Sequence, residues 1–387
     1  MRPRSLALVL AGGAGGRLEL LTEHRAKPAV PYAGTHRLVD VPLSACASAG
    51  VDDVWVLQQT HPSSLAAHLA NGRPWDLDRT TGGVLALQPS QGTDRAGFTE
   101  GTADALWRKA PQVRDAAPDL LVLLSADAGY RLDLDAVMAA HRESGAAVTA
   151  VTAPVPAGEQ ASRFGVVEVD GERVTSYAYK PEQPASGVVT TEVFVCSTVE
   201  VLDLLEELEA DAGDDGLKDL GTALLPRLAQ AGRLRAHPID GYWRDLGTVD
   251  SYWRGHQELL GEDPAFRLHD DVLPVRTRPT RADPARVLRG ATVEDSLLAP
   301  GCTVAGEVVR SVLSPGAVVE AGAVVRDCVL LPGAVVRSGA VVERTVLDDG
   351  ADVAARVGGP SAVTLVGLGT RATEDLAPGA RWPAPPE

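Results

Sequence analysis

A small motif recurs through the last quarter of the chain, and it restricts the fold more than any other feature of the sequence. Segments such as APGCTV, SPGAVV, LPGAVV and DDGADV each place a glycine just before a short pair of small or apolar residues. Gly316, Gly333 and Gly350 are 17 residues apart, and Gly322 and Gly339 are again 17 apart. A turn glycine that returns at this constant spacing is typical of a parallel β-helix.

We therefore expect residues 288–387 to form a parallel β-helix of hexapeptide repeats that includes a C-terminal tail. In its coils we expect Val318 and Val335 to face inward. A β-sandwich of repetitive hairpins is the alternative for this region, but hairpins would not keep one common period across successive coils.

The first part of the chain has a different pattern, in which short apolar runs alternate with longer mixed segments. We expect strands at 6–10, 54–57, 120–124, 148–151 and 192–196, and helices at 65–69, 134–143 and 199–208. Strands that alternate with helices indicate an α/β domain around a parallel or mixed sheet. We assign residues 1–270 to this domain and residues 271–287, rich in Pro, Arg and Thr, to a linker.

Charge and composition exclude several classes of partner. The chain carries 36 basic against 52 acidic residues, a formal charge of -16, which disfavours general binding to nucleic acid or to an anionic membrane. No run approaches the roughly 20 apolar residues of a membrane helix. The four cysteines are far apart and have no metal-ligand spacing, so we expect reduced, buried thiols and a cytoplasmic protein.

Near the N-terminus, LVLAGGAGGR places a run of glycines directly after a predicted strand. We expect this loop to open a helix, so that bare backbone N–H groups can approach a di- or triphosphate. The Gly-Lys-Ser/Thr of a P-loop is absent, and the spacing does not fit a dinucleotide-binding fingerprint. Arg17 after the loop and Lys27 before Pro28 strengthen the phosphate-binding interpretation over a plain tight turn.

These residues carry a resemblance to a known family. The opening LVLAGG…R…KP resembles the nucleotidyltransferases that act on sugar 1-phosphates, and among them most closely ADP-glucose pyrophosphorylase. The similarity continues through RLVDVPLS, GTADAL, LSADAGYRLD, FGVV, YKP and YWRDLGT, and extends into the hexapeptide region. It implies a Rossmann-like domain of the GT-A type with a mixed sheet.

The resemblance also implies a reaction and a set of site residues. A sugar 1-phosphate oxygen attacks the α-phosphorus of an NTP, pyrophosphate leaves, and Mg²⁺ balances the phosphate charge. The implied catalytic residues are Arg17, Lys27 and Asp127, and the implied Mg²⁺ ligands are Asp127 and Asp245. The implied nucleotide-binding residues are Leu10, Ala11, Gly12, Gly13, Gly15, Gln59, Gly101 and Thr102, and the implied acceptor-binding residues are Tyr179, Lys180, Glu192 and Asp245.

The sequence departs from the family pattern near both substrates. Tyr179 replaces the glutamate of a Glu-Lys-Pro motif, and Glu192 replaces a glycine. Thr99 stands where an aromatic residue usually precedes the Gly-Thr-Ala-Asp run, so the base read here need not be adenine. Because hydroxyl-binding groups discriminate strongly between substrates, these changes suggest a changed acceptor.

The leading hypothesis is therefore a relative that joins GTP or ATP to a glucose-like 1-phosphate. A pseudo-sugar such as valienol 1-phosphate, used with GTP in aminocyclitol antibiotic synthesis, is its specific form. The alternatives are an ordinary ADP-glucose pyrophosphorylase of glycogen synthesis and a non-catalytic regulatory subunit. A hexapeptide acyltransferase is disfavoured because residues 288–357 contain no histidine. By the same resemblance we expect a homo-oligomer, a dimer or a tetramer.

Overall fold

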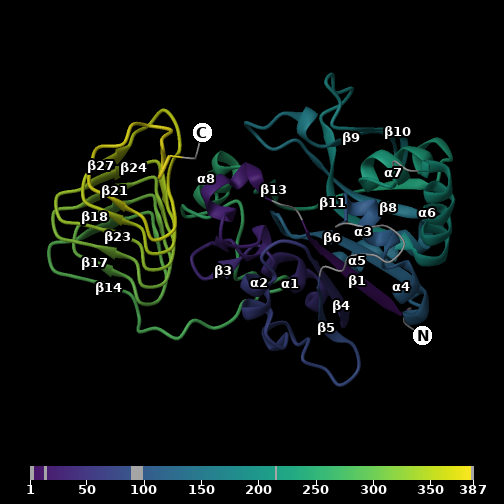
Figure 1. Cartoon of the computed structure of the whole chain (residues 1–387), viewed down its shortest axis with the longest axis horizontal. Helices are drawn as coiled ribbons and strands as arrows, with labels where there is room; N and C mark the ends of the chain where they lie inside the picture. The colour runs from purple at the N-terminus through teal and green to yellow at the C-terminus, as the bar shows by residue number, and fades with distance from the viewer. Residues whose placement is uncertain (1–3, 13–14, 89–98, 214–215, 385–387) are drawn as a thin grey trace.

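The computed structural model describes residues 4–12, 15–88, 99–213 and 216–384. Figure 1 shows two parts side by side, an α/β domain and a coiled stack of short strands, joined by an extended segment. The predicted fold class, an α/β domain followed by a parallel β-helix, is confirmed.

The α/β domain is built on one nine-stranded mixed sheet. Its first four strands run parallel, and β11 is antiparallel to both of its neighbours, β6 and β8. The strand order is β5 (Gly83–Leu87), β4 (Asp53–Gln58), β1 (Ser5–Ala11), β6 (Leu120–Ser125), β11 (Val188–Ser197), β8 (Val148–Pro154), β12 (Leu234–Pro238), β10 (Arg173–Tyr179) and β9 (Gly165–Asp170).

Helices cover both faces of this sheet because its strands are apolar on both sides. In β1, Leu6 and Leu8 enter one core cluster, whereas Ala7 and Val9 enter the other. This alternation is the two-residue period of a strand buried on both faces. The helices are α1 (Asp40–Ser48), α2 (Pro62–Leu69), α3 (Thr102–Trp107), α4 (Ala110–Ala116), α5 (Leu134–Ser144), α6 (Thr198–Ala212), α7 (Leu220–Gln230) and α8 (Val249–Gln257).

Short elements complete the domain. Two two-stranded ribbons pair β2 (Pro31–Tyr32) with β3 (His36–Arg37) and β7 (Ala128–Tyr130) with β13 (Trp243–Asp245). The 3₁₀ turns are η1 (Gly16–Thr22), η2 (Lys27–Ala29), η3 (Arg73–Trp75) and η4 (Ala161–Arg163). Among the described residues, no helix combines the length and the apolar character needed to cross a membrane.

Three parallel sheets form the walls of the β-helix. The first contains β14 (Arg286–Val287), β17 (Thr303–Val304), β20 (Val318–Val319), β23 (Val335–Val336), β26 (Asp352–Val353) and β29 (Arg371–Ala372). The second contains β15 (Thr292–Glu294), β18 (Glu307–Val309), β21 (Val324–Arg326), β24 (Val341–Glu343) and β27 (Arg356–Gly358). The third contains β16 (Leu297–Leu298), β19 (Val312–Leu313), β22 (Val329–Leu330), β25 (Thr345–Leu347), β28 (Thr364–Val366) and β30 (Arg381–Trp382).

In the first wall, β17, β20, β23, β26 and β29 each bury only their second residue, and our expectation for this wall was wrong by one position. Val319 and Val336 pair in register and are fully buried, whereas Val318 and Val335 are only half-buried. Adjacent residues of a strand point to opposite faces, so an inward Val319 forces Val318 outward. Gly316 and Gly333 take φ values of 75° and 71°, which explains the recurring glycine at this corner. All four cysteines are buried and free, as predicted.

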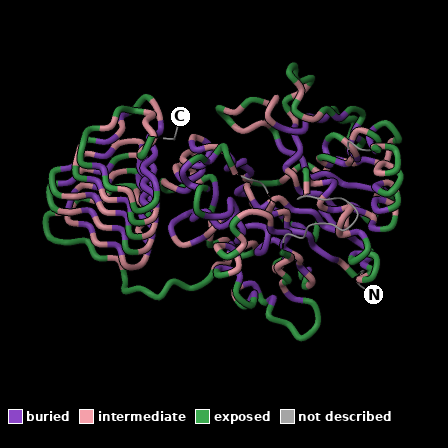
Figure 2. Tube along the Cα trace, viewed as in Figure 1, coloured by how far each residue is buried: buried purple, intermediate pink, exposed green. Residues whose placement is uncertain are grey.

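The β-helix packs against the α/β domain through its third wall. Leu331 and Leu365 belong to the same core cluster as Ala7 and Val9 of the sheet. Figure 2 shows buried segments on the sides of the two parts that face each other. Arg25 donates to the fully buried Asp348 over 2.7 Å. The indole N–H of Trp253, in α8, donates to the Asp327 carbonyl over 2.7 Å. The predicted linker is also docked, since the Arg276 amide donates to Ser44 over 2.8 Å.

Candidate active site

A cavity of about 650 Å³ opens at the C-terminal ends of β1, β4 and β6. Ligands bind at this edge in open α/β sheets because the loops that follow parallel strands converge there. The predicted site residues that line the cavity are Leu10, Ala11, Gly12, Gly15, Arg17, Lys27, Gln59, Gly101, Thr102, Asp127, Tyr179, Lys180, Glu192 and Asp245. Gly13 lies outside the described residues.

The glycine loop needs its glycines for close approach. A β-carbon on Gly12 would lie 2.9 Å from the Gln59 side chain, and one on Gly15 would lie 2.8 Å from Thr22. The regular helix predicted after the loop is replaced by the 3₁₀ turn η1. Its geometry follows from Glu19, which has a φ of 52°, and from Thr22, whose hydroxyl donates back to the Gly15 carbonyl over 3.0 Å.

Two aspartates meet because of the ribbon formed by β7 and β13. Asp127 precedes β7, Asp245 ends β13 opposite Ala128, and the Leu246 amide donates to the Asp127 carbonyl over 3.0 Å. This pairing brings together two carboxylates that are far apart in the sequence. Their side chains face the same cavity.

Each aspartate has a cationic partner. The Lys27 ammonium donates to Asp127 over 2.6 Å, and the Arg163 guanidinium donates to Asp245 over 2.9 Å. Burial raises the pKa of Asp127, but the charge and hydrogen bond of Lys27 outweigh it and leave this pKa below its usual value. Burial, followed by the negative charge of Asp127, raises the pKa of Asp245. The two carboxylates therefore repel each other and would be relieved by an additional positive charge.

The side chains of Lys27 and Arg17 both lie close to the backbone of Gly247. A β-carbon on Gly247 would lie 2.9 Å from the Lys27 ammonium, 2.9 Å from an Asp245 oxygen and 3.1 Å from the Arg17 guanidinium. Arg17 itself is exposed, and it has no ion-pair partner among the described residues. An uncommitted guanidinium beside a glycine loop is suited to bind phosphate oxygens.

At the other end of the cavity, Tyr179 and Lys180 belong to a separate network. The Tyr179 hydroxyl donates to Asp219 over 3.1 Å, and the Lys180 ammonium donates to that hydroxyl over 2.8 Å. The other Asp219 oxygen accepts from the Thr102 amide over 3.2 Å. The Tyr179 ring lies against bare backbone of α7, because a β-carbon on Gly221 would approach it to 2.3 Å.

Sequence reasoning missed Arg163, Asp219 and Lys109, all of which line the cavity. Arg163 immediately precedes the FGVV motif, so its position next to a family motif could have identified it. Asp219 is 40 residues from Tyr179, its partner, and no local pattern indicates that pairing.

Comparison with known proteins identifies the family of the chain. Residues 6–262 match the family model described as "Nucleotidyl transferase". The chain belongs to the nucleotidyl transferase family. Residues 279–359 match a second model, "GlmU-like, C-terminal hexapeptide", so both parts of this nucleotidyltransferase have known relatives.

Individual relatives cover most of the chain. The nucleotidyltransferase is 38% identical to the glucose-1-phosphate adenylyltransferase of Thermosipho africanus over 83% of its length and 77% of the relative. It is 42% identical to the enzyme of the same name from Thermomicrobium roseum, over 77% and 69% of the two chains. A Clostridium botulinum enzyme of this name is 37% identical over 84% of each chain.

Proposed function

We propose that this nucleotidyltransferase transfers the adenylyl group of ATP to glucose 1-phosphate. A phosphate oxygen of the sugar phosphate forms a bond to the α-phosphorus, the bond from that phosphorus to the bridging oxygen breaks, and pyrophosphate leaves. The observation that carries the proposal is the convergence of Arg17, Lys27, Asp127 and Asp245 in one cavity with Lys180. The names of the relatives supply the base and the sugar.

The cations of the cavity have distinct roles in this proposal. Arg17, exposed beside the glycine loop, neutralises the charge that grows on the departing pyrophosphate. Lys27, which is buried and held by Asp127, is positioned to contact the α-phosphate. Lys180 binds the acceptor phosphate, so that attacking and leaving groups have separate cations.

The carboxylate pair fits a divalent metal ion. Asp127 and Asp245 offer hard oxygen ligands that repel each other, which is the donor chemistry that Mg²⁺ prefers. Within the described ranges no cluster of three or more His, Cys, Asp or Glu side chains has metal-binding geometry, so substrate phosphates would complete the coordination. Bound Mg²⁺ would supply Lewis-acid stabilisation of phosphate charge. Asp127 would then exchange Lys27 for the metal, which frees the ammonium for substrate.

Pyrophosphate release should be measured over a matrix of ATP and GTP with glucose 1-phosphate and a cyclitol 1-phosphate, with each product identified by mass. The proposal expects ADP-glucose as the best product. Arg17→Ala should abolish most of this activity, and the exposed surface variant Arg114→Ala should retain it. Absence of pyrophosphate release from every pair would contradict the proposal and favour a non-catalytic subunit.

A second candidate is guanylyl transfer to a cyclitol 1-phosphate such as valienol 1-phosphate, which the sequence departures favoured. Tyr179 and Glu192 both line the cavity, so the two altered positions do face the substrates. The cited relatives lend this candidate no support, since all three are named for glucose 1-phosphate and adenylyl transfer. The same matrix separates the two candidates.

A further inference from the structure

Glu192 occupies a strained position in the central sheet. It lies in β11, where the pairing with β8 breaks between Thr190 and Phe194, and its φ is 59°. This left-handed conformation is uncommon for a residue with a side chain, and glycine adopts it freely. A strained backbone that persists inside a cavity is a pointer to function.

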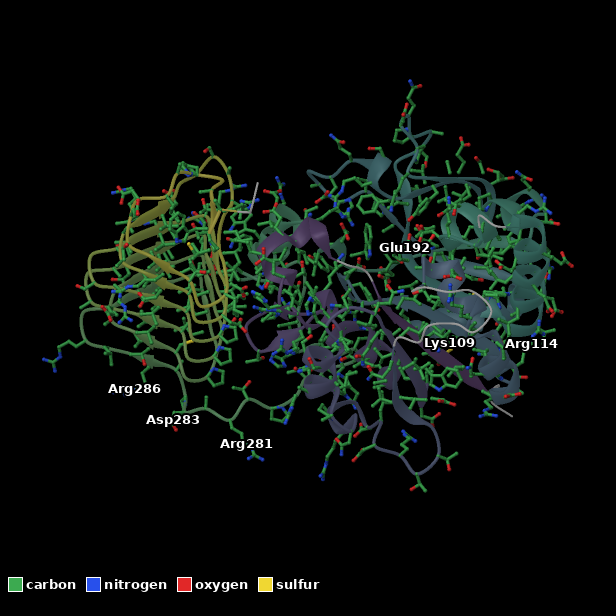
Figure 3. All side chains as sticks on the ribbon, viewed as in Figure 1. Lys109, Arg114, Glu192, Arg281, Asp283 and Arg286 are labelled. Carbon is green, nitrogen blue, oxygen red and sulfur yellow. The ribbon has the colours of Figure 1, made fainter. Side chains whose placement is uncertain are left out.

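The Glu192 carboxylate is also electrostatically unfavourable where it lies. Burial, followed by the negative charge of Asp127, raises the pKa of Glu192 to about 7, against an opposing contribution from Lys180. Figure 3 shows Glu192 within the α/β domain, whereas Arg114 lies toward its outer edge. The left-handed backbone and the unfavourable carboxylate charge of Glu192 both cost folding free energy. No requirement of the fold explains a glutamate at this position.

Glu192 differs from the other carboxylates of the cavity in its bonding. Asp127, Asp245 and Asp219 each accept a hydrogen bond from a cation, a hydroxyl or an amide. Within the described residues, Glu192 has no hydrogen-bond or ion-pair partner, although it lines the cavity. Its acceptor capacity is therefore available to a ligand.

The neighbouring hydroxyls already form hydrogen bonds within the protein. The Thr190 hydroxyl donates to the Gly165 carbonyl, and the Thr191 hydroxyl donates to the Val151 carbonyl over 3.1 Å. The Tyr179 hydroxyl is already bound to Asp219. Near Lys180, Glu192 thus provides the open carboxylate acceptor for groups carried by the acceptor's ring.

We propose that Glu192 is a specificity-determining residue that accepts hydrogen bonds from ring hydroxyls of the acceptor, a polyhydroxylated six-membered ring bearing a 1-phosphate. The proposal rests on the function proposed above. The 1-phosphate binds Lys180, and the ring extends toward Glu192. The left-handed backbone of Glu192 directs its carboxylate to this contact. Two adjacent hydroxyls can each donate to one carboxylate oxygen.

The test compares Glu192→Gly with wild type, using glucose 1-phosphate and its 2-, 3-, 4- and 6-deoxy analogues. Wild type should lose at least about tenfold in kcat/KM for one or two adjacent deoxy analogues, and Glu192→Gly should treat parent and analogues alike. Glu192→Gly should raise the KM for glucose 1-phosphate about tenfold or more, with the KM for ATP changed less than about twofold.

A stability measurement separates this role from a structural one. Without ligands, Glu192→Gly should raise the Tm by about 1–3 °C, because it relieves the left-handed backbone. Ala117→Gly is the matched control: Ala117 ends α4 with a φ of 46° and is exposed outside the cavity, so its Tm should rise with an unchanged KM. Glu192→Gln, which keeps an acceptor without the charge, should retain part of the deoxy discrimination.

An active wild type whose Glu192→Gly variant keeps its KM and its deoxy pattern would overturn this inference and leave the proposed function standing. A lower Tm in Glu192→Gly would also overturn it, by showing that the carboxylate holds the fold. If wild type releases no pyrophosphate with any acceptor, the proposed function fails instead. Binding of glucose 1-phosphate to both proteins by calorimetry would then test the contact alone, and equal affinities would overturn it.

Discussion

The two ends of the cavity differ in whether their carboxylates have partners within the protein. We call the end with Arg17, Asp127 and Asp245 the phosphate end, and the end with Tyr179, Lys180 and Glu192 the acceptor end. At the phosphate end, Asp127 pairs with Lys27 and Asp245 pairs with Arg163. Arg17 lines the cavity without an ion-pair partner among the described residues. At the acceptor end, Glu192 is strained and unpaired among the described residues, and Tyr179 is committed to Asp219. Under the proposed function, the phosphate end binds the charge that every NTP carries, whereas the acceptor end selects one particular ring.

This difference indicates where substrate choice resides. A balanced cluster of charges binds any triphosphate with similar strength, so it supports the chemistry without selecting the acceptor. A half-buried acceptor group without a partner in the protein favours only a ligand that hydrogen-bonds to it. We therefore expect variants at the phosphate end to lower kcat, and variants at the acceptor end to change KM for the 1-phosphate.

The largest effect should follow loss of either carboxylate of the proposed metal site. Asp127→Asn or Asp245→Asn should lower kcat by about 10³-fold, because several kcal/mol of charge stabilisation are lost. Pyrophosphate release at saturating Mg²⁺ is the measurement. Asp203→Asn, an exposed carboxylate paired with Arg114, is the control and should be unaffected. Near-normal turnover in either site variant would show that the metal assignment is wrong.

A smaller and more selective effect is expected at Lys180. Lys180→Ala should raise the KM for the 1-phosphate by about 10–100-fold and leave the KM for ATP within about threefold, because it removes a charge-assisted contact to one substrate. Initial rates with each substrate varied in turn give both constants. A selective loss of ATP affinity would place Lys180 at the other end of the cavity.

Removal of the Tyr179 hydroxyl should have a milder effect. Tyr179→Phe loses the bond to Asp219 and the hydrogen bond from Lys180, but keeps the ring against α7. We expect the KM for the 1-phosphate to rise about two- to fivefold, or up to about 1 kcal/mol, because the hydroxyl acts on this substrate only through Lys180. Identical kinetics in Tyr179→Phe would show that the network does not position Lys180.

The smallest effect concerns pH and the folded state. The folded-state pKa of Glu192 lies at about 7, above its unfolded value, so this group stabilises the fold fully only below its unfolded pKa. That contribution is lost as the pH rises toward 7. Relative to wild type, the unfolding free energy of Glu192→Gln should therefore rise between pH 4.5 and pH 7.5, measured by denaturant titration in EDTA. A pH-independent difference would contradict the electrostatic account.

The fold was predictable wherever the sequence repeats a local pattern. The 17-residue spacing of Gly316, Gly333 and Gly350 indicated the β-helix, and apolar runs such as 120–124 located the strands. The inward residue of each coil was not predictable from the spacing, because Val318 and Val319 are both valine. Burial alone distinguishes them.

The site was predictable only as far as family motifs reach. Motif matching identified Asp127 and Asp245, but their meeting depends on the β7–β13 ribbon, which joins distant segments. Asp219 and the left-handed backbone of Glu192 have no signature in the sequence. Side-chain partners and backbone strain depend on tertiary contacts, and these required the structure.

The separation of the two ends is tested most directly by Mg²⁺–ATP binding, measured by calorimetry without acceptor. We predict that Lys180→Ala and Glu192→Gly bind Mg²⁺–ATP within about twofold of wild type, and that Arg17→Ala and Lys27→Ala bind at least about tenfold more weakly. Equal losses in all four variants would contradict the account, because they would show a single coupled site with no distinct acceptor end.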